Sequence, residues 1–331
     1  MPSTDDEPGS TLDIKEIFKD SQLTKDEDPE TWMRAVRDKL FSIFCSPVKE
    51  EYTSEAFKWV SHLCVLFKDL TWISPDGKWS DEESKIFVCI ASLAITELHI
   101  LLPLLQRHLT CGEEPELEEG RILARSANSH DYDKFGSHLI ILESVIKSLV
   151  KGQELNDNDE TKFNSLAGSI KGQILSNLLE RLKDFMTSIC EYLETVHHQW
   201  ETLVKEPGSM KLTAAQGALR IVSVWLSEDP ESFEPQCKRF LIDLLVKNLM
   251  LTNSGAGHDI LILALHSVCL QNRDALRHLK QVPKYREALE TYLMYVQREG
   301  SKSGSRRNAK CLKLRCGLVK DLMSDGSTRS D

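Results

Sequence analysis

A run of apolar residues, IFVCIASLAITELHILLPLL at 86–105, most strongly constrains the folds open to this chain. Its length suits a helix that crosses a bilayer. However, Glu97, His99 and Pro103 lie inside the run, and a carboxylate near the bilayer centre costs on the order of 2–3 kcal/mol. A helix that is apolar on nearly all sides is typical of the core of a helical protein. We therefore predict a buried helix here rather than a membrane span.

Helical patterns separated by short polar breaks extend from Thr31 to about Glu299, without convincing strand-like alternation. The 331 residues, of which 41% are hydrophobic and 28% charged, are enough to bury a large core in a soluble protein. Ser80 and Glu83 have the spacing of a capping box, which predicts a helix start at SDEE. Predicted helices cover 31–44, 54–70, 81–106, 134–151, 163–200, 211–226, 232–250, 257–271 and 282–299.

Two near copies of one acidic motif, EDPETW at 27–32 and EDPESF at 228–233, could mark either an acid/base site or helix starts. Asp28 and Asp229 fit the N-cap position, and a proline follows each of them at the first helical position. Trp32 comes four positions after the cap, where its side chain can turn onto the core. We predict structural roles for these residues, because capping accounts for every residue of the motif.

The segment that contains the second copy indicates how the helices pack. In GALRIVSVWL at 217–226 only Arg220 and Ser223 are strongly polar, so we expect this helix to be covered on nearly all sides, with Arg220 and Trp225 structural. In the next helix one face is polar and carries Arg239, Asp243 and Lys247 as an ion-pair ladder. Its apolar stripe comprises Cys237, Phe240, Leu241, Leu244, Leu245 and Leu249.

A buried helix joined by a short turn to an amphipathic one is the unit of an α-solenoid, in which neighbouring pairs cover each other's apolar faces. No strict repeat period can be read from the sequence, so the repeats would be degenerate. The predicted fold class is therefore all-α, an α-solenoid of degenerate armadillo/HEAT-like helical repeats. A closed helical bundle is the alternative.

Charge and cysteine usage divide the chain and indicate its compartment. Residues 1–30 carry ten acids and three lysines, which predicts a disordered acidic arm before a solenoid over 31–299. The region 300–331 is basic, and we expect a flexible tail there. Nine cysteines, mostly in apolar helical runs, favour a reducing compartment, and no signal or transit peptide is visible, so we expect a cytoplasmic protein. The nearly balanced body indicates no specific nucleic acid.

The basic segment RRNAKCLKLRCGLVKDLM at 306–323 is the strongest candidate for recognition. It places Leu314, Leu318 and Leu322 on one helical stripe. This pattern is typical of a segment that binds calmodulin or an anionic membrane surface. A solvated tail is the alternative interpretation. The candidate partner-binding residues are Arg306, Arg307, Lys310, Lys313 and Arg315.

Candidate catalytic and metal motifs are weak. Glu194 and His197 form an E-x-x-H on one helix face, one turn after Cys190, but a di-iron bundle needs a second such motif. We interpret this face as solvated. No G-x-S-x-G nucleophile motif occurs. We therefore predict a protein without catalytic residues, metal ions or cofactors.

Three segments together resemble neurochondrin-type proteins: FVCIASLAITELHILL (87–102), HLIILESVIKSLV (138–150) and GALRIVSVWLSEDPESF (217–233). The first two agree in apolar spacing and in Glu97 and Glu143. The third agrees best, through an A-x-R-[IV]-[LV]-x-x-W-L-x-E core that comprises Ala218, Arg220, Ile221, Val222, Trp225, Leu226 and Glu228. The resemblance covers about 31–290 at low identity, and because members of the family are much longer, this chain is expected to be a shortened or partial member.

The resemblance implies a cytoplasmic, armadillo-like scaffold or regulatory adaptor without enzymatic activity, which acts in neuronal signalling and neurite outgrowth. It further implies restraint of calcium/calmodulin-dependent kinase phosphorylation and binding to receptor tails and endosomal membranes. Kinase or receptor tails are thus the expected protein partners. A trafficking or transport adaptor that binds cargo in the same groove is the alternative, and an all-α enzyme of an unrecognised type is a third possibility.

Overall fold

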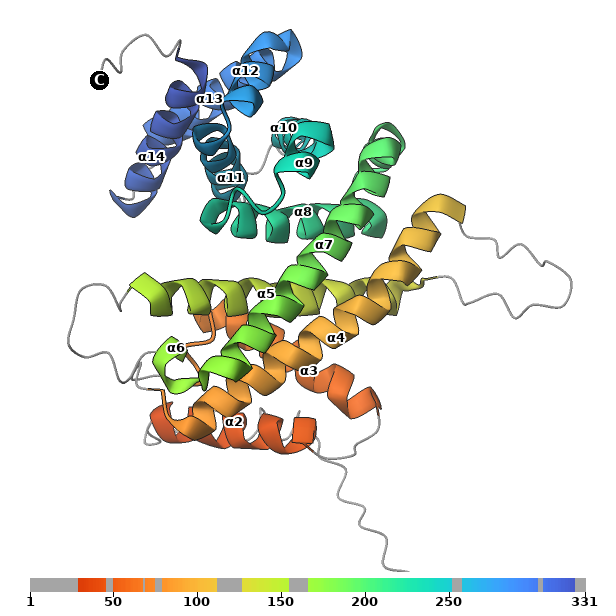
Figure 1. Cartoon of the computed structure of the whole chain (residues 1–331), viewed down its shortest axis with the longest axis vertical. Coiled ribbons are helices and arrows are strands. Elements are labelled where there is room, and N and C mark those ends of the chain that lie inside the picture. Colours follow the sequence, from red (N-terminus) through yellow and green to blue (C-terminus); the bar gives the residue numbers. More distant parts are fainter. Residues whose placement is uncertain are drawn as a thin grey trace, which may run out of the picture.

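The computed structural model describes residues 29–45, 50–67, 69–74, 79–111, 127–154, 166–251, 258–302 and 306–324, and every regular element among them is a helix (Figure 1). The predicted all-α fold is thereby confirmed. In chain order the elements are α2 Pro29–Cys45, α3 Glu50–Phe67, α4 Asp81–Cys111, α5 Ser129–Glu154, α6 Leu166–Ser169, α7 Gly172–Leu203, α8 Met210–Glu228, α9 Glu234–Gln236, the π-helix η2 Cys237–Leu241, α10 Ile242–Leu251, α11 His258–Gln271, α12 Arg273–Gln281, α13 Pro283–Lys302 and α14 Arg306–Met323.

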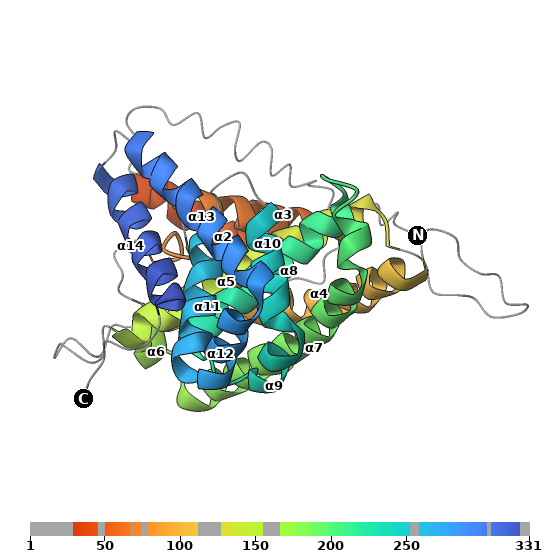
Figure 2. The ribbon, with the colours of Figure 1, turned by 90° about the horizontal axis from the view of Figure 1, so that it is seen from above.

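The long helices after α2 alternate between two rows. In one row α3, α5, α8, α11 and α14 each pack on the next helix of the row. In the other row α4 packs on α7, α7 on η2, and α10 on α13. The pairs α4/α5, α7/α8, α10/α11 and α13/α14 connect the two rows, and these pairs follow one another from the bottom to the top of Figure 1. Seen from above, α13 and α14 lie side by side at the end of this order (Figure 2).

Helix α8 is covered on nearly all sides, as its sequence predicts. It packs on α5, α7 and α11. The buried Ser223 does not disturb this packing, because its hydroxyl donates to the Leu219 carbonyl oxygen at 2.7 Å. The buried side chains of α8 are Leu212, Ala214, Ala215, Ala218, Leu219, Ile221, Val222, Ser223, Val224 and Leu226.

Among the described residues, helix α4 is long and apolar enough to cross a membrane, judged by length and composition only. Its large side chains, such as Ile90, Ile95 and Leu98, are nevertheless buried, and the helix packs along α5 and α7. Its inner carboxylate, Glu97, is paired at 2.8 Å with Lys134 of α5. Packing within the protein therefore accounts for the apolar run, as predicted.

The start of α4 confirms the predicted capping box. The Glu83 backbone N–H donates to Ser80 Oγ at 3.2 Å, and the Ser80 N–H donates to the Glu83 carboxylate at 2.9 Å. Two N–H groups that the first turn leaves free are satisfied in this way. Glu83 has a second role, since its carboxylate also accepts from Arg37 of α2 at 2.8 Å.

The predicted N-cap role of Asp229 is wrong. Helix α8 continues through Glu228, and Asp229 is its C-cap, with its N–H bonded to the Trp225 carbonyl oxygen at 2.8 Å. Turns follow, in which the Asp229 carboxylate accepts from Ser232, and the next helix begins at Glu234 with Pro235 in its first turn. Helix α8 thus extends into the acidic motif, as far as Glu228, because its apolar face is packed against neighbouring helices. In the first copy α2 begins at Pro29, while Asp28 and the Trp32 side chain lie outside the described part.

Other boundaries differ where local signals are weak. The helix predicted over 163–200 is divided, because α6 ends at Ser169 and α7 starts at Gly172. Helix α12 was not predicted, since it buries only Ala275 and Leu279; the Asn272 side chain caps its start by accepting from two backbone N–H groups. The predicted arm over 1–30 falls almost wholly outside the described residues.

We expect Gly136→Ala to raise the free energy of unfolding by about 0.5–1 kcal/mol, because glycine in a helix interior costs that much relative to alanine. A Cβ at Gly136, inside α5, would meet nothing within 4 Å. Gly217 of α8 provides a matched control, since a Cβ there would lie 3.1 Å from Leu139 Cδ1. Gly217→Ala should therefore gain less or lose stability in urea unfolding. Equal gains at both positions would contradict the packing of α5 against α8.

Candidate functional site

Two hollows flank the N-terminal half of α7. The first lies between α4, α6 and α7 and has a volume of about 330 Å³; we call it the α4–α7 pocket. The second lies between α5, α7 and the end of α8 and has a volume of about 440 Å³; we call it the α5–α8 groove. Both volumes lie within the range of ordinary binding sites, which is about 300–1,000 Å³.

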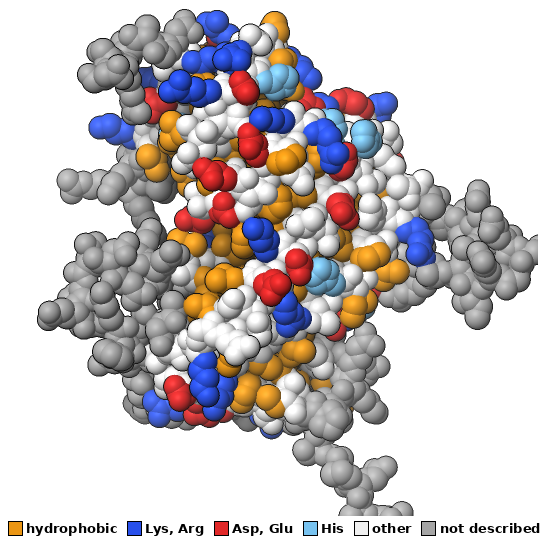
Figure 3. Space-filling view, in the orientation of Figure 1, with side chains coloured by type: hydrophobic (Ala, Val, Ile, Leu, Met, Phe, Trp, Pro, Cys, Tyr) orange, Lys and Arg blue, Asp and Glu red, His pale blue; other side chains and the backbone are white. Residues whose placement is uncertain are grey.

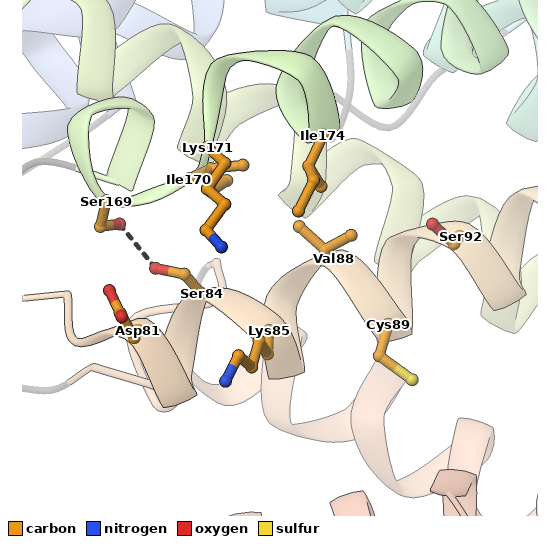
Figure 4. A pocket seen from close by; sticks show the side chains of 10 residues that line it. All are labelled: Asp81, Ser84, Lys85, Val88, Cys89, Ser92, Ser169, Ile170, Lys171 and Ile174. Carbon is orange, nitrogen blue, oxygen red and sulfur yellow. Dashed lines mark hydrogen bonds between the residues drawn. The ribbon is translucent and has the colours of Figure 1, made fainter.

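The α4–α7 pocket is shown in Figure 4, where Val88 of α4 and Ile174 of α7 face each other across the hollow. At one end the hydroxyls of Ser84 and Ser169 are 2.6 Å apart. Because the Ser169 hydroxyl donates to the Leu166 carbonyl oxygen, the Ser84 hydroxyl is the donor between the two serines. Both hydroxyl protons are thus used within the protein, and neither serine resembles an activated nucleophile.

Cys89 also lines this pocket, and its sulfur points away from α7 in Figure 4. Burial and the neighbouring thiol of Cys45 raise the pKa of Cys89 to about 11. The thiol is therefore protonated at neutral pH, whereas a nucleophilic cysteine requires a lowered pKa. Burial likewise raises the pKa values of Cys190, Cys237 and Cys269 to about 12, and these side chains pack as small apolar groups.

The α5–α8 groove has apolar walls and an acidic end. In Figure 3 hydrophobic side chains gather where α5, α7 and α8 meet, and acidic side chains lie above them. Leu179 of α7 is 42% exposed there. Glu228 and Asp229, at the end of α8, are both exposed. The apolar lining comprises Ile146, Leu149, Val150, Leu175, Leu179, Leu182 and Trp225.

Trp225, for which the sequence predicts a structural role, packs partly buried against the core and also forms part of this groove. The leucines of α7 were missed by the sequence analysis. The leucines of LSNLLERL at 175–182 have the i, i+3, i+4, i+7 spacing of a single apolar stripe, so the sequence alone does not distinguish the exposed one. In the structure Leu178 and Leu182 are buried, and Leu179 is exposed.

Arg220 has a structural role in joining α8 to α5. Its guanidinium binds both carboxylate oxygens of Glu143, with Nε and Nη2 each 2.7 Å from one oxygen. Lys147 also donates to this carboxylate, at 2.5 Å. Burial alone would raise the pKa of Glu143, but these hydrogen bonds hold it below its ordinary value. The bidentate geometry favours arginine over lysine at this position.

Asp243 of α10 joins three helices of one row. Its carboxylate accepts from His197 Nε2 of α7 at 2.8 Å and from Lys247 of its own helix at 2.9 Å. From α13 it accepts from Tyr285 at 2.6 Å and from Lys284 at 3.0 Å. Burial raises the pKa of Asp243, yet these four donors together lower it well below its ordinary range. The Asp243 carboxylate thus links α10 to α7 and α13.

The E-x-x-H face is consequently paired within the protein. Glu194 binds Arg239 at 2.5 Å, while His197 binds Asp243. The predicted ladder is therefore only partly formed, since Lys247 pairs with Asp243 but Arg239 turns to α7. Within the described ranges no group of three or more His, Cys, Asp or Glu side chains is placed to hold a metal ion.

The region expected to be a solvated basic tail is instead packed in its described part. Helix α14 contacts α11 and α13, and Val319 and Leu322 are buried. Arg315 is only 13% exposed and pairs with Asp259 of α11 at 3.0 Å. The predicted apolar stripe of Leu314, Leu318 and Leu322 is not one buried face, because Leu322 is buried whereas Leu314 is 63% exposed. A calmodulin-type partner would thus have to displace α14 from this position.

The remaining candidate recognition residues of α14 are less informative. Lys313 is exposed. The side chains of Arg306, Arg307 and Lys310 lie outside the described part, although their backbone is in α14.

We expect Asp243→Asn to lower the free energy of unfolding by about 2–3 kcal/mol at neutral pH, since it removes charge-assisted hydrogen bonds in a mostly buried cluster. The folded-state pKa of Asp243 lies below the unfolded value of about 3.9. Its contribution is therefore complete above that value and is lost as the pH falls through it towards the folded pKa. The difference between wild type and variant, measured by urea unfolding, should shrink as the pH is lowered from about 7 to about 3.

Glu290→Gln serves as the control for this prediction. Glu290 pairs with Arg286 on the exposed face of α13, where an ion pair contributes on the order of 0.5 kcal/mol or less. A loss at Asp243 no larger than the loss at Glu290 would contradict the linking role of the cluster.

Val319→Asp should release α14, because a carboxylate would be placed at a position with 0% exposure, where its loss of hydration is costly. Hydrogen exchange measured by mass spectrometry should then rise across 312–323, while α4 keeps its protection. Leu314→Asp, on the exposed side of the same helix, should leave both unchanged. Unaltered exchange in the Val319 variant would show that α14 is not held by this contact.

No family model, no curated protein and no solved structure matches the chain. The resemblance to neurochondrin-type proteins is therefore a hypothesis about this chain.

Proposed function

We propose that this protein is a non-enzymatic scaffold or regulatory adaptor built as an α-solenoid of degenerate armadillo/HEAT-like repeats. The alternation of helices between two rows supports the repeat architecture. So does the spacing of helix starts in one row, at Met210, His258 and Arg306, because 258 − 210 and 306 − 258 are both 48 residues. Such intervals are close to those of armadillo and HEAT units, which are about 40–47 residues long.

The observation that carries the adaptor function is the α5–α8 groove. Of the apolar side chains that line this hollow of about 440 Å³, only Ile146 and Leu182 are buried, whereas Leu179 remains 42% exposed. Solenoids commonly use such extended surfaces between repeats to bind other proteins. An apolar hollow that the described residues do not fill is suited to a protein partner.

The ionisable groups support a non-enzymatic role. Catalytic sites use groups with shifted pKa values that face a substrate cavity. Here the lowered pKa values of Asp243 and Glu143 arise from hydrogen bonds to their carboxylates, chiefly from Tyr285 of α13 to Asp243 and from Arg220 of α8 to Glu143. The raised pKa values of the cysteines arise chiefly from burial. These shifts are explained by packing.

On the resemblance to neurochondrin-type proteins, we further propose a cytoplasmic role in neuronal signalling, with kinase or receptor tails as partners. Binding to calmodulin or to an anionic membrane surface through 306–323 would require α14 to leave its contacts with α11 and α13. Partner binding in the groove requires no such rearrangement, and we favour it.

Affinity capture from neuronal cells, combined with cross-linking mass spectrometry on the full chain, tests this function. We expect reproducible protein partners whose cross-links map onto α5, α7 and α8. Kinases or receptor tails among them would support signalling, whereas coat proteins or small GTPases would identify a trafficking adaptor. The absence of any partner enriched over an unrelated helical control protein would refute the adaptor function.

A further inference from the structure

We propose that the α5–α8 groove binds a cationic amphipathic helix of a partner protein. Its apolar side chains would contact Leu175, Leu179 and Trp225, and a lysine or arginine would pair with Glu228 and Asp229. This inference rests on the proposed adaptor function and specifies the chemistry of the partner.

The apolar part of the argument comes from the walls of the groove. Three helices, α5, α7 and α8, each contribute large aliphatic or aromatic side chains, so the hollow exists only when these helices are packed together. An amphipathic helix binds in such a groove through apolar residues spaced three and four positions apart. Leu179, which is accessible to water, would be buried by this contact.

The charged part of the argument comes from the end of α8. Glu228 and Asp229 are exposed and form no ion pair with the described residues; their carboxylates accept only from the hydroxyls of Ser227 and Ser232. Both lie at the C-terminal end of the helix, where the helix dipole makes negative charge unfavourable and positive charge favourable. The fold therefore leaves two carboxylates without compensation beside an apolar surface.

Two described cations of the helices that form the groove, Lys147 and Arg181, are paired elsewhere. Lys147 of α5 is bound to Glu143. Arg181, the arginine of α7 that follows the exposed leucine, donates to the Ser92 carbonyl oxygen at 3.1 Å and to Thr96 Oγ1 at 2.8 Å, both on α4. The side chain thus turns away from α5 and α8. Among the described residues no cation is thus paired with the acidic end of the groove, and a partner can supply one.

This charge pattern distinguishes the partner. Other carboxylates that join helices in this protein, such as Glu143, Glu194 and Asp243, have arginine or lysine partners within the chain. An acidic helix would be repelled by Glu228 and Asp229, and an uncharged apolar helix would leave them uncompensated. A cationic amphipathic helix satisfies both surfaces at once.

Binding of synthetic helical peptides to the full chain, measured by fluorescence anisotropy, tests the proposal. The probe is a leucine/lysine peptide with one apolar face. A scrambled peptide of the same composition and a leucine/glutamate peptide are the comparisons. We expect the leucine/lysine helix to bind at least about tenfold more tightly than either, a difference that corresponds to about 1.4 kcal/mol. Equal binding of the scrambled peptide would overturn the proposal, because net charge alone would then explain the affinity.

Variants locate the site. Leu179→Asp and the double variant Glu228→Lys/Asp229→Lys should each weaken binding at least about tenfold, and thermal unfolding should show that both remain folded, since all three side chains are exposed. Glu287→Lys/Glu290→Lys on α13 makes the same change in net charge at exposed positions and should have little effect. An equal loss in this control would overturn the proposal.

Two further results separate the possible explanations. If captured cellular partners bind equally well to wild type and to Leu179→Asp, the adaptor function stands and the groove is not its site. If wild type forms a dimer by size-exclusion chromatography and Leu179→Asp is monomeric, the groove binds a second copy of the chain, which contradicts the cationic partner. If wild type captures no partner at all, the adaptor function itself fails.

Discussion

The fold depends on mutual burial of apolar faces by successive helix pairs, and α8 shows this most clearly. Its sequence is apolar around nearly its whole circumference, so no single neighbour could shield it from water. α5, α7 and α11 together cover it. Because burial of a large aliphatic side chain contributes about 1.5–3 kcal/mol, α8 is stable only when the pairs before and after it are in place. The structure is therefore held by contacts between pairs rather than by any one pair.

Ion pairs and hydrogen bonds also join the surfaces of neighbouring helices. Arg220 and Glu143 join α8 to α5 through a bidentate contact, and Asp243 joins α7, α10 and α13. In both cases burial alone would raise the carboxylate pKa, and hydrogen bonds donated to the carboxylate lower it. The α5–α8 groove differs from these two contacts. Its carboxylates, Glu228 and Asp229, are paired with no described cation, and Leu179 is exposed. The α5–α8 groove thus combines an exposed apolar side chain with carboxylates that no described cation pairs, which suits it to another molecule.

Particular elements show which sequence patterns were informative. The stripe in 237–249 and the coverage of α8 follow directly from 3.6-residue periodicity, and all six residues predicted for the stripe are buried. The capping box at Ser80 was predicted because both of its partners lie within four residues of each other. The prediction for Asp229 was wrong because α8, whose apolar face is packed, continues through Glu228. Asp229 is therefore the C-cap of α8, although its sequence context resembles an N-cap. α14 was misread because Arg315 depends on Asp259, which lies 56 residues earlier (315 − 259).

The sequence by itself determined the all-α class, the buried character of α4 and α8 and the capping box at Ser80. Each of these depends on side-chain periodicity or on hydrogen bonds between near neighbours. Only the tertiary structure decided that α14 is packed, that Glu194 and His197 bind Arg239 and Asp243 instead of water, and that Leu179 and Glu228 border one groove. The physical reason is that each of these features is a contact between side chains on different helices. Which helices come into contact is decided by the packing of all the helices together.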